Sequence, residues 1–161
     1  MKISLIQFPI VPGDRLANFD QVRRRVQQAA RAGSDMAVLP ELWDLSFYPP
    51  DVYDLAGAQI LFVPAAWPHP RLAHWQILNR ARAIENQFFV VAVNSCGTCG
   101  DYRFCGHSMI IDPWGEVLAQ GGDGEEIVTG EIDLSVIKDI RSRINVFRDR
   151  RPELYHLEGK R

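Results

Sequence analysis

A single carboxylate, Glu41, follows an apolar run in the segment "AVLPELW" and is the first candidate for chemistry. The run before it, "DMAVLP", predicts a buried strand, which would place Glu41 at the carboxyl end of that strand. In open α/β sheets, ligands bind at the carboxyl ends of strands. A carboxylate in that place can take or deliver a proton, provided that partner groups lie beside it.

The segment "SCGTCGDYRFCGHS" holds the second set of reactive side chains, namely Cys96, Cys99, Cys105 and His107. Three thiolates and an imidazole suit zinc, and the first two cysteines have the common two-residue spacing. The second pair, Cys105 and His107, does not have this spacing. We therefore favour small thiols in a hairpin and a structural histidine, with no metal. Zinc binding stays an open alternative. A thioredoxin-like role for "CGTC" is weaker, because a redox pair of that type precedes a helix.

Composition places the chain among ordinary globular proteins. It has 161 residues, of which 47% are hydrophobic and 24% charged, and its formal net charge is −2. We expect one domain, residues 1–161, with enough length to bury a core. The near-zero net charge and the lack of long basic runs argue against nucleic acid or a membrane surface as a partner. We also expect no cofactor.

The segment "MKISLIQFPIVPGD" predicts a first strand, because Gln7 and Pro9 interrupt its apolar run, and it does not resemble a signal peptide. An odd number of cysteines without an export signal predicts reduced thiols and a cytoplasmic protein.

The elements that must position these groups alternate along the chain. An amphipathic helix over residues 13–33 is expected between strands at 3–11 and 35–42, with Asn18 as N-cap and Gly33 as its stop. Its expected core positions are Phe19, Val22, Val26 and Ala29 or Ala30. A strand, a helix and a strand in this order build a mostly parallel sheet.

The second half repeats this pattern. We expect a strand at 58–67 ended by Pro64, a helix at 70–87, a strand at 88–96, two short strands around the turn "DPWG", a strand at 125–134 and a basic, partly helical tail. The stretch from residue 45 to 60 is irregular, and it is barely long enough for a crossover between parallel strands.

Several separate segments together resemble the nitrilase, or carbon–nitrogen hydrolase, superfamily, and most closely its ω-amidase-like branch. They are "VLPELW", "ILFVPAAWP", "RARAIENQFFVVAVN", "GHSMIIDPWGEVLA", "GEIDL" and "FRDRRPELY". The resemblance covers nearly the whole chain in the family's order. It implies an α/β fold, a four-layer α-β-β-α sandwich that is usually paired as a dimer, and hydrolysis of amides or nitriles by a Glu, Lys and Cys triad.

In that triad, the thiolate attacks the carbonyl carbon, the carboxylate takes the thiol proton and passes it to the leaving ammonia, and the cation stabilises the oxyanion. Glu41 matches the family's carboxylate. The family's Lys and Cys lie between the "PEL" segment and the "LFVPAAW" strand, and that block is absent here, with the junction near residues 55–57. We therefore expect a sandwich truncated internally.

The lysines and cysteines that the chain does contain do not stand at the family's positions for the missing pair. The lysines are Lys2, Lys138 and Lys160, and none is placed like an oxyanion lysine. The segment "CGDYRF", which begins at Cys99, looks like the family's nucleophile segment, but the "GHSMIIDPWG" near it places this segment in a later hairpin. A relocated nucleophile would also need a base and oxyanion donors nearby.

The remaining candidates are supporting residues. Tyr48 and Trp67 are expected to line a substrate pocket, although both positions also suit packing. Arg82 and Glu85 lie three residues apart on a helix and should pair with each other or with neighbouring backbone, unless Glu85 supports the site. The basic tail should bond acids at a subunit interface through Arg148, Arg150 and Arg151.

Three functional hypotheses follow. The first is an amidase for small non-peptide amides that is impaired because Glu41 has no nucleophile to deprotonate. The second is a non-catalytic interaction module, a homo-oligomer that pairs through the family's dimerisation surface. The third is an active hydrolase that uses a relocated thiol, either Cys105 or a thiol from a partner chain.

Overall fold

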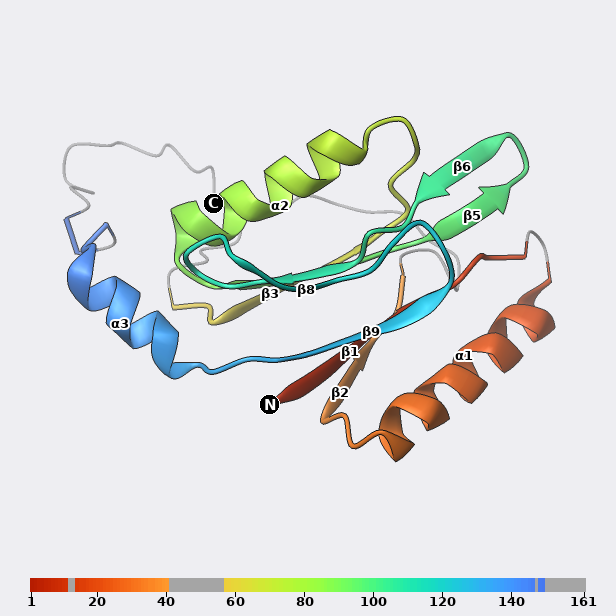
Figure 1. Ribbon diagram of the computed structural model, residues 1–161, viewed down its shortest axis with the longest axis horizontal. Coiled ribbons are helices and arrows are strands. Elements are labelled where there is room, and N and C mark those ends of the chain that lie inside the picture. The colour runs from red at the N-terminus through yellow and green to blue at the C-terminus, as the bar shows by residue number, and fades with distance from the viewer. Residues whose placement is uncertain (12–13, 41–56, 147, 150–161) are drawn as a thin grey trace, which may run out of the picture.

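The computed structural model describes residues 1–11, 14–40, 57–146 and 148–149. Two sheets lie face to face in the middle of the molecule, and a long helix covers the outer face of each (Figure 1). The predicted α-β-β-α sandwich is therefore confirmed.

The first sheet has the strand order β2-β1-β9. Strand β1 (Lys2–Gln7) runs parallel to β2 (Met36–Val38), with Leu5 opposite Val38. Strand β9 (Glu126–Glu131) pairs antiparallel on the other side of β1. The parallel pair β1 and β2 is the strand–helix–strand unit that the sequence predicts, although β2 is much shorter than expected.

The second sheet has the order β3-β4-β7-β8. Strand β3 (Ile60–Ala65) is parallel to β4 (Phe89–Asn94), and β7 (Met109–Ile111) and β8 (Val117–Gln120) follow antiparallel. A separate two-stranded hairpin, β5 (Cys96–Cys99) and β6 (Tyr102–Cys105), extends from the end of β4.

The side chains of β4 alternate between two cores, which explains why this strand is apolar throughout. Phe89, Val91 and Val93 pack between the two sheets, against Ile3 and Leu5 of β1. The intervening residues face helix α2 (Leu72–Asn86), where Trp75 and Ala83 complete a second core. A strand buried on both faces has no polar side to present to water.

Helix α1 (Arg15–Arg31) packs on the outer face of the first sheet, but with a different face from the one that the sequence predicts. Val22 and Ala29 are buried as expected, whereas Phe19 is 57% exposed and Val26 is 37% exposed. Asn18 takes the place of an apolar residue, because its buried side chain exchanges two hydrogen bonds with the backbone of Val11.

The N-terminus of α1 also differs from the prediction, whereas its C-terminus agrees with it. Asp14, and not Asn18, is the N-cap, since its carboxylate accepts a 2.9 Å hydrogen bond from the N–H of Ala17. At the other end, Gly33 has φ +78 and stops the helix as predicted.

Strand β3, the turn before β8 and the helical part of the tail can also be compared with the predictions. Strand β3 runs through Pro64 to Ala65, which the structure accommodates because β3 is the edge of its sheet. The turn "DPWG" is confirmed by the 2.9 Å bond from the N–H of Gly115 to the carbonyl of Asp112. Helix α3 (Ser135–Arg143) is the helical part of the tail.

Candidate active site

The carboxyl ends of β1, β3 and β4 meet at one edge of the molecule, which we call the carboxyl edge and define by Gln7, Trp67 and Asn94. Asn94, the last residue of β4, lies opposite Ala65, the last residue of β3. Ser108 joins β1 to β4, because its hydroxyl lies 2.6 Å from Oε1 of Gln7 and accepts a 3.0 Å bond from the N–H of Asn94. This is the edge at which α/β sheets bind ligands.

Gln7 is a fully buried amide at the centre of this network. Its Oε1 accepts hydrogen bonds from the hydroxyl and the N–H of Ser108, and its Nε2 donates to the carbonyls of Gly122 and Gly124. Both donors and both acceptor positions of the amide are therefore used. Gln7 thus ties the end of β1 to the start of β7 and to the segment before β9.

Asn94 plays the same role at the end of β4. Its Oδ1 accepts a 2.6 Å bond from the N–H of Trp67, and its Nδ2 lies 2.9 Å from the carbonyl of Gly106 and 3.3 Å from Sγ of Cys105. Sequence reasoning missed both amides as site residues. The available signal was a single amide inside or directly after an otherwise apolar strand, in "SLIQF" and "VVAVN".

Glu41 and Tyr48 lie outside the described residues, so their roles stay predictions. The chain that leads to Glu41 is described as far as Pro40, which is buried. Val38 lies beside Leu5, and Leu39 packs against the core that contains Ile6 and Phe8. Strand β2 therefore points toward the carboxyl edge, as the sequence predicts for the strand that precedes Glu41.

Trp67 lies at the carboxyl edge with its ring turned toward α2. The ring packs 5.9 Å from that of Trp75 between centroids, and the guanidinium of Arg71 lies 5.1 Å over it. The indole N–H donates to the carbonyl of Arg71. These are packing contacts, and the role of Trp67 in lining a substrate pocket stays a prediction.

The thiol of Cys105 lies within the carboxyl edge, but its surroundings keep it protonated. Its Sγ contacts Nδ2 of Asn94 and lies 3.4 Å from the carbonyl of Trp67, and the residue is 2% exposed. Burial raises the pKa of Cys105, against smaller opposing effects from a backbone hydrogen bond and Asn94. A thiol in this state is a poor nucleophile, because the thiolate is the reactive form.

The other two cysteines differ in exposure. Burial, with a smaller contribution from Glu125, raises the pKa of Cys96 to about 11. Cys99 is half-exposed at the tip of the hairpin. All three thiols are free.

These surroundings predict different reactivities. At a pH of about 7.5, an alkylating reagent should modify Cys99 within minutes and leave Cys96 and Cys105 unmodified. The reason is that the fraction of a cysteine present as thiolate falls about tenfold for each unit by which the pH lies below its pKa. Mass spectrometry of the labelled protein counts the modified thiols, and Cys99→Ser should show none under the same conditions. Rapid labelling of Cys105 in the folded protein would contradict the assignment of a buried, protonated thiol.

His107 has a structural role in the described part of the chain. Its Nδ1 lies 2.7 Å from the carbonyl of Cys105, and its own carbonyl accepts a 2.8 Å bond from the indole of Trp75. The carboxylate of Asp123 lies 3.4 Å from Nδ1. Among the described residues, no three histidine, cysteine or acidic side chains form a group that would hold a metal ion.

Both described lysines lie away from the carboxyl edge. Lys2 begins β1, and its Nζ donates to the carbonyl of Ala32 after α1. Five residue steps of extended strand, about 17 Å, separate it from Gln7. Lys138 is on α3. Lys160, like Arg150 and Arg151, lies outside the described residues.

Two surface features contain predicted residues, an ion pair on α2 and a small pocket lined by Arg148. Arg82 and Glu85 form an ion pair on α2, which confirms one of the predicted arrangements. Both side chains are at least half-exposed, so the pair adds little stability. Arg148 is exposed and lines a small pocket with Gln87 and Arg141.

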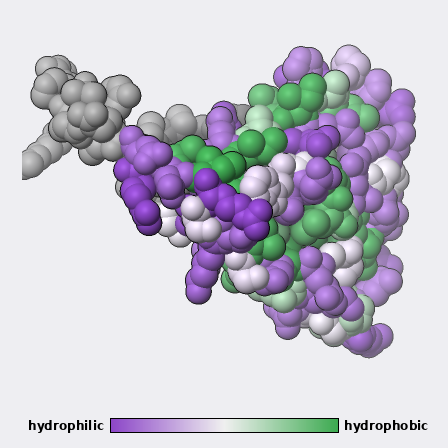
Figure 2. All heavy atoms as spheres, turned by 60° about the vertical axis from the view of Figure 1, so that its left-hand side comes forward, coloured by the Kyte–Doolittle hydropathy of each residue, from purple (hydrophilic) through white to green (hydrophobic). Residues whose placement is uncertain are grey.

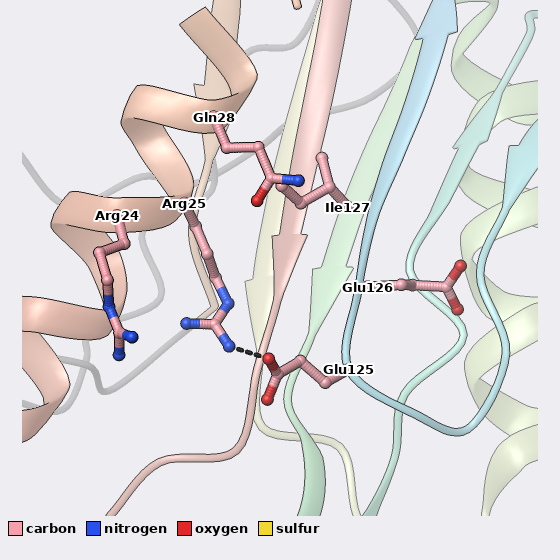
Figure 3. A pocket seen from close by; sticks show the side chains of 6 residues that line it. All are labelled: Arg24, Arg25, Gln28, Glu125, Glu126 and Ile127. Atoms are coloured by element: carbon pink, nitrogen blue, oxygen red, sulfur yellow. Dashed lines mark hydrogen bonds and ion pairs between the residues drawn. The ribbon is translucent and has the colours of Figure 1, made fainter. Parts of the chain in front are cut away.

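A pocket of about 530 Å³ lies between α1 and the start of β9 (Figure 3). Arg25 and Glu125 point toward each other across it and form an ion pair, while Glu126 points away from the helix. Arg24 and Gln28 complete the helix side. Two positive and two negative side chains give this pocket no net preference for a charged ligand.

None of the described helices has the length and hydrophobicity needed to cross a bilayer.

Comparison with solved structures gives the same fold. A carbon–nitrogen hydrolase from Helicobacter pylori superposes with a TM-score of 0.87 at 18% identity, covering 100% of this chain and 99% of that one. The yeast protein Nit3, a member of branch 10 of the nitrilase superfamily, superposes with a TM-score of 0.83 at 17% identity, covering 94% and 96%.

Comparison of sequences identifies relatives. The chain is 57% identical over 99 residues to 2-oxoglutaramate amidase of Bacillus subtilis, covering 62% of this chain and 38% of that protein. It is 36% identical over 152 residues to the human omega-amidase NIT2, covering 93% and 51%. The chain thus spans about half the length of these relatives or less. The carbon–nitrogen hydrolase family model matches residues 2–59 and 48–142. Because these matches take in most of its length, the chain belongs to the carbon–nitrogen hydrolase family, in the ω-amidase-like branch of the nitrilase superfamily.

Proposed function

We propose that this chain keeps the amidase scaffold of its family without a competent Glu, Lys and Cys triad, and that it is catalytically impaired. The observation that carries this proposal is the composition of the carboxyl edge. Its described thiol, Cys105, is buried and protonated, and neither described lysine lies near it. Glu41 would then have no nucleophile to deprotonate.

An internal deletion near residues 55–57, within a single domain of residues 1–161, explains this composition. The family model matches in two stretches that overlap at residues 48–59, as expected where two distant parts of the family sequence have been joined. Phe62 of β3 supports the same proposal. It shares a strand face with Ile60, which packs between the sheets, yet Phe62 is 37% exposed. An uncovered residue on an inner face is consistent with missing strands.

The substrate class follows from the relatives, two of which are named for 2-oxoglutaramate and one as an ω-amidase. We propose small non-peptide amides as the ligands, with Tyr48 and Trp67 lining their pocket. A cytoplasmic location agrees with the three free thiols.

Restoring the missing block tests this proposal. The corresponding segment of the Bacillus subtilis relative would be inserted between Ala56 and Gly57, and ammonia release from 2-oxoglutaramate and simple monoamides would be measured. We expect the folded chimera to exceed the parent chain by about 10³-fold or more, the range that loss of a nucleophile costs hydrolases. Glu41→Gln in the chimera should abolish the gain. A folded chimera that gains nothing would show that the deletion does not explain the missing activity.

A second function, as an interaction module that forms homo-oligomers, is favoured by the sheet edges. Within the described residues, β2 and β3 are edge strands, and Met36 and Phe62 on them are more than one-third exposed. Figure 2 shows hydrophobic side chains reaching the surface between hydrophilic ones on the face turned toward the viewer. Exposed apolar edge strands pair with other chains.

We therefore expect the purified chain to self-associate, with a sedimentation coefficient that rises with protein concentration. A charge on the edge, Phe62→Lys, should shift the equilibrium toward the monomer, because edge lysines prevent strand pairing. Leu16→Lys on α1, where Leu16 is 81% exposed, is the matched control and should change little. A monomer at all concentrations with a cooperative thermal transition would remove the support for this second function.

A further inference from the structure

The two buried cysteines of the hairpin form a cross-strand pair that the sequence motif does not suggest. In the antiparallel register of β5 and β6, Cys96 lies directly opposite Cys105, whereas Cys99 lies opposite Tyr102. Side chains directly opposite each other in antiparallel strands lie on the same face. The geometric partner of Cys96 is therefore Cys105, and not Cys99 of the "CGTC" motif.

The backbone hydrogen bonds define the type of this pair. Ser95 and Gly106 are the pair next to Cys96 and Cys105. The N–H of Gly106 donates to the carbonyl of Ser95 at 3.0 Å, so this neighbouring pair is a hydrogen-bonded one. The N–H of Cys105 instead turns away from β5 and donates to the carbonyl of Trp67 at 3.2 Å. Cys96 and Cys105 thus occupy a non-hydrogen-bonded position, where Cα atoms are about 4.5 Å apart.

That spacing falls within the range that a disulfide accepts, about 4.4–6.8 Å between Cα atoms. We propose that Cys96 and Cys105 are joined by a disulfide across β5 and β6 when the protein meets a peroxide. In the first step, the thiolate of one cysteine attacks a peroxide oxygen, the O–O bond breaks, and a sulfenic acid and water form. In the second, the other thiol attacks the sulfenic sulfur, the S–O bond breaks, and a second water leaves. Two thiols lose two electrons and two protons, and one hydrogen peroxide becomes two waters.

The position of the hairpin allows a small oxidant to reach these buried sulfurs. The two strands form a sheet of their own that projects from one end of the molecule (Figure 1). A two-stranded hairpin is marginally stable and opens more easily than the central sheets. Because both thiols are protonated at neutral pH, the reaction is slow and becomes complete over hours.

Bond formation acts on the carboxyl edge. Sγ of Cys105 contacts Nδ2 of Asn94 at 3.3 Å and donates to the carbonyl of Trp67 at 3.4 Å, and a bond to Cys96 removes the S–H that makes this donation. Asn94 and Trp67 end β4 and follow β3, so the oxidation state of the hairpin changes contacts at the candidate site. This inference rests on the register of the hairpin and does not depend on the proposed function.

The test uses the whole chain carrying Cys99→Ser, which removes the exposed thiol and keeps the pair. After incubation with excess hydrogen peroxide, we expect both remaining thiols to be lost, the mass to fall by two hydrogens, and peptide mapping to find Cys96 linked to Cys105. Cys96→Ser and Cys105→Ser, each with Cys99→Ser, should not lose two hydrogens. Retention of both thiols in the folded protein, or their oxidation to sulfinic acids without a link, would overturn the proposal. In the wild-type chain, a Cys96–Cys99 link would overturn it as well.

Discussion

Replacing Trp75 with alanine should lower the free energy of unfolding by about 3–5 kcal/mol, the largest effect expected of any single substitution here. Trp75 is 2% exposed, lies in the core between α2 and the second sheet, and packs against the tilted ring of Trp67. At about 2–4 °C per kcal/mol for a chain of this size, Tm should fall by roughly 10 °C. Thermal or urea unfolding followed by circular dichroism measures the change.

Two variants separate the causes. Trp75→Phe keeps an aromatic ring in the core but loses the indole donor to the carbonyl of His107, and it should cost about 1–2 kcal/mol. Ile77→Ala, on the same helix but 65% exposed, should stay within about 0.5 kcal/mol of the parent. Equal losses for Trp75→Ala and Ile77→Ala would contradict the orientation of α2 on the sheet.

Replacing Gln7 with leucine should cost about 3 kcal/mol in the free energy of unfolding, although leucine has a similar size and is more hydrophobic. The substitution leaves the N–H of Ser108 and the carbonyl of Gly124 without their side-chain partners inside the protein. Gln27→Leu on the exposed side of α1 is the matched control and should be nearly neutral. An equally small effect at both positions would show that Gln7 does not hold the carboxyl edge together.

The variant Gln7→Glu should add a pH dependence of known sign. A carboxylate here would face the carbonyl oxygens of Gly122 and Gly124 in a fully buried place, so its pKa would be raised. The folded state would then bind more protons than the unfolded state. The free energy of unfolding should therefore rise as the pH is lowered from about 7 to about 5, relative to the parent. A flat difference over this range would contradict the buried environment of Gln7.

The sequence predicted the layers of this fold because hydrophobic periodicity reports which faces are buried. The uninterrupted apolar run of β4 and the apolar positions of α2 gave these elements almost at their observed bounds. The face of α1 was predicted less well. Phe19 and Val26 are apolar but exposed, whereas Asn18 is polar but buried through two backbone hydrogen bonds. Hydrophobic periodicity assigns a polar residue to the surface. It contains no information about the backbone of Val11, whose hydrogen bonds allow Asn18 to be buried.

The candidate site shows the same limit. The sequence placed a strand end before Glu41, and the structure directs β2 toward the carboxyl edge. The residues that join the strands there, Gln7, Asn94 and Ser108, are far apart in the sequence and meet only through the packing of two sheets. The pairing of Cys96 with Cys105 also depends on strand register, which a spacing motif does not encode.

The central claim, that the triad is incomplete, is tested most directly by ammonia release from a panel of small amides by the purified, folded chain. The parent would be assayed beside Glu41→Gln and Cys105→Ser, with a thermal melt to confirm that each protein is folded. The composition of the carboxyl edge predicts release no faster than the buffer background in all three. Release by the parent that disappears in both variants would contradict the claim, because it would show that Cys105 serves as a nucleophile with Glu41 as its base.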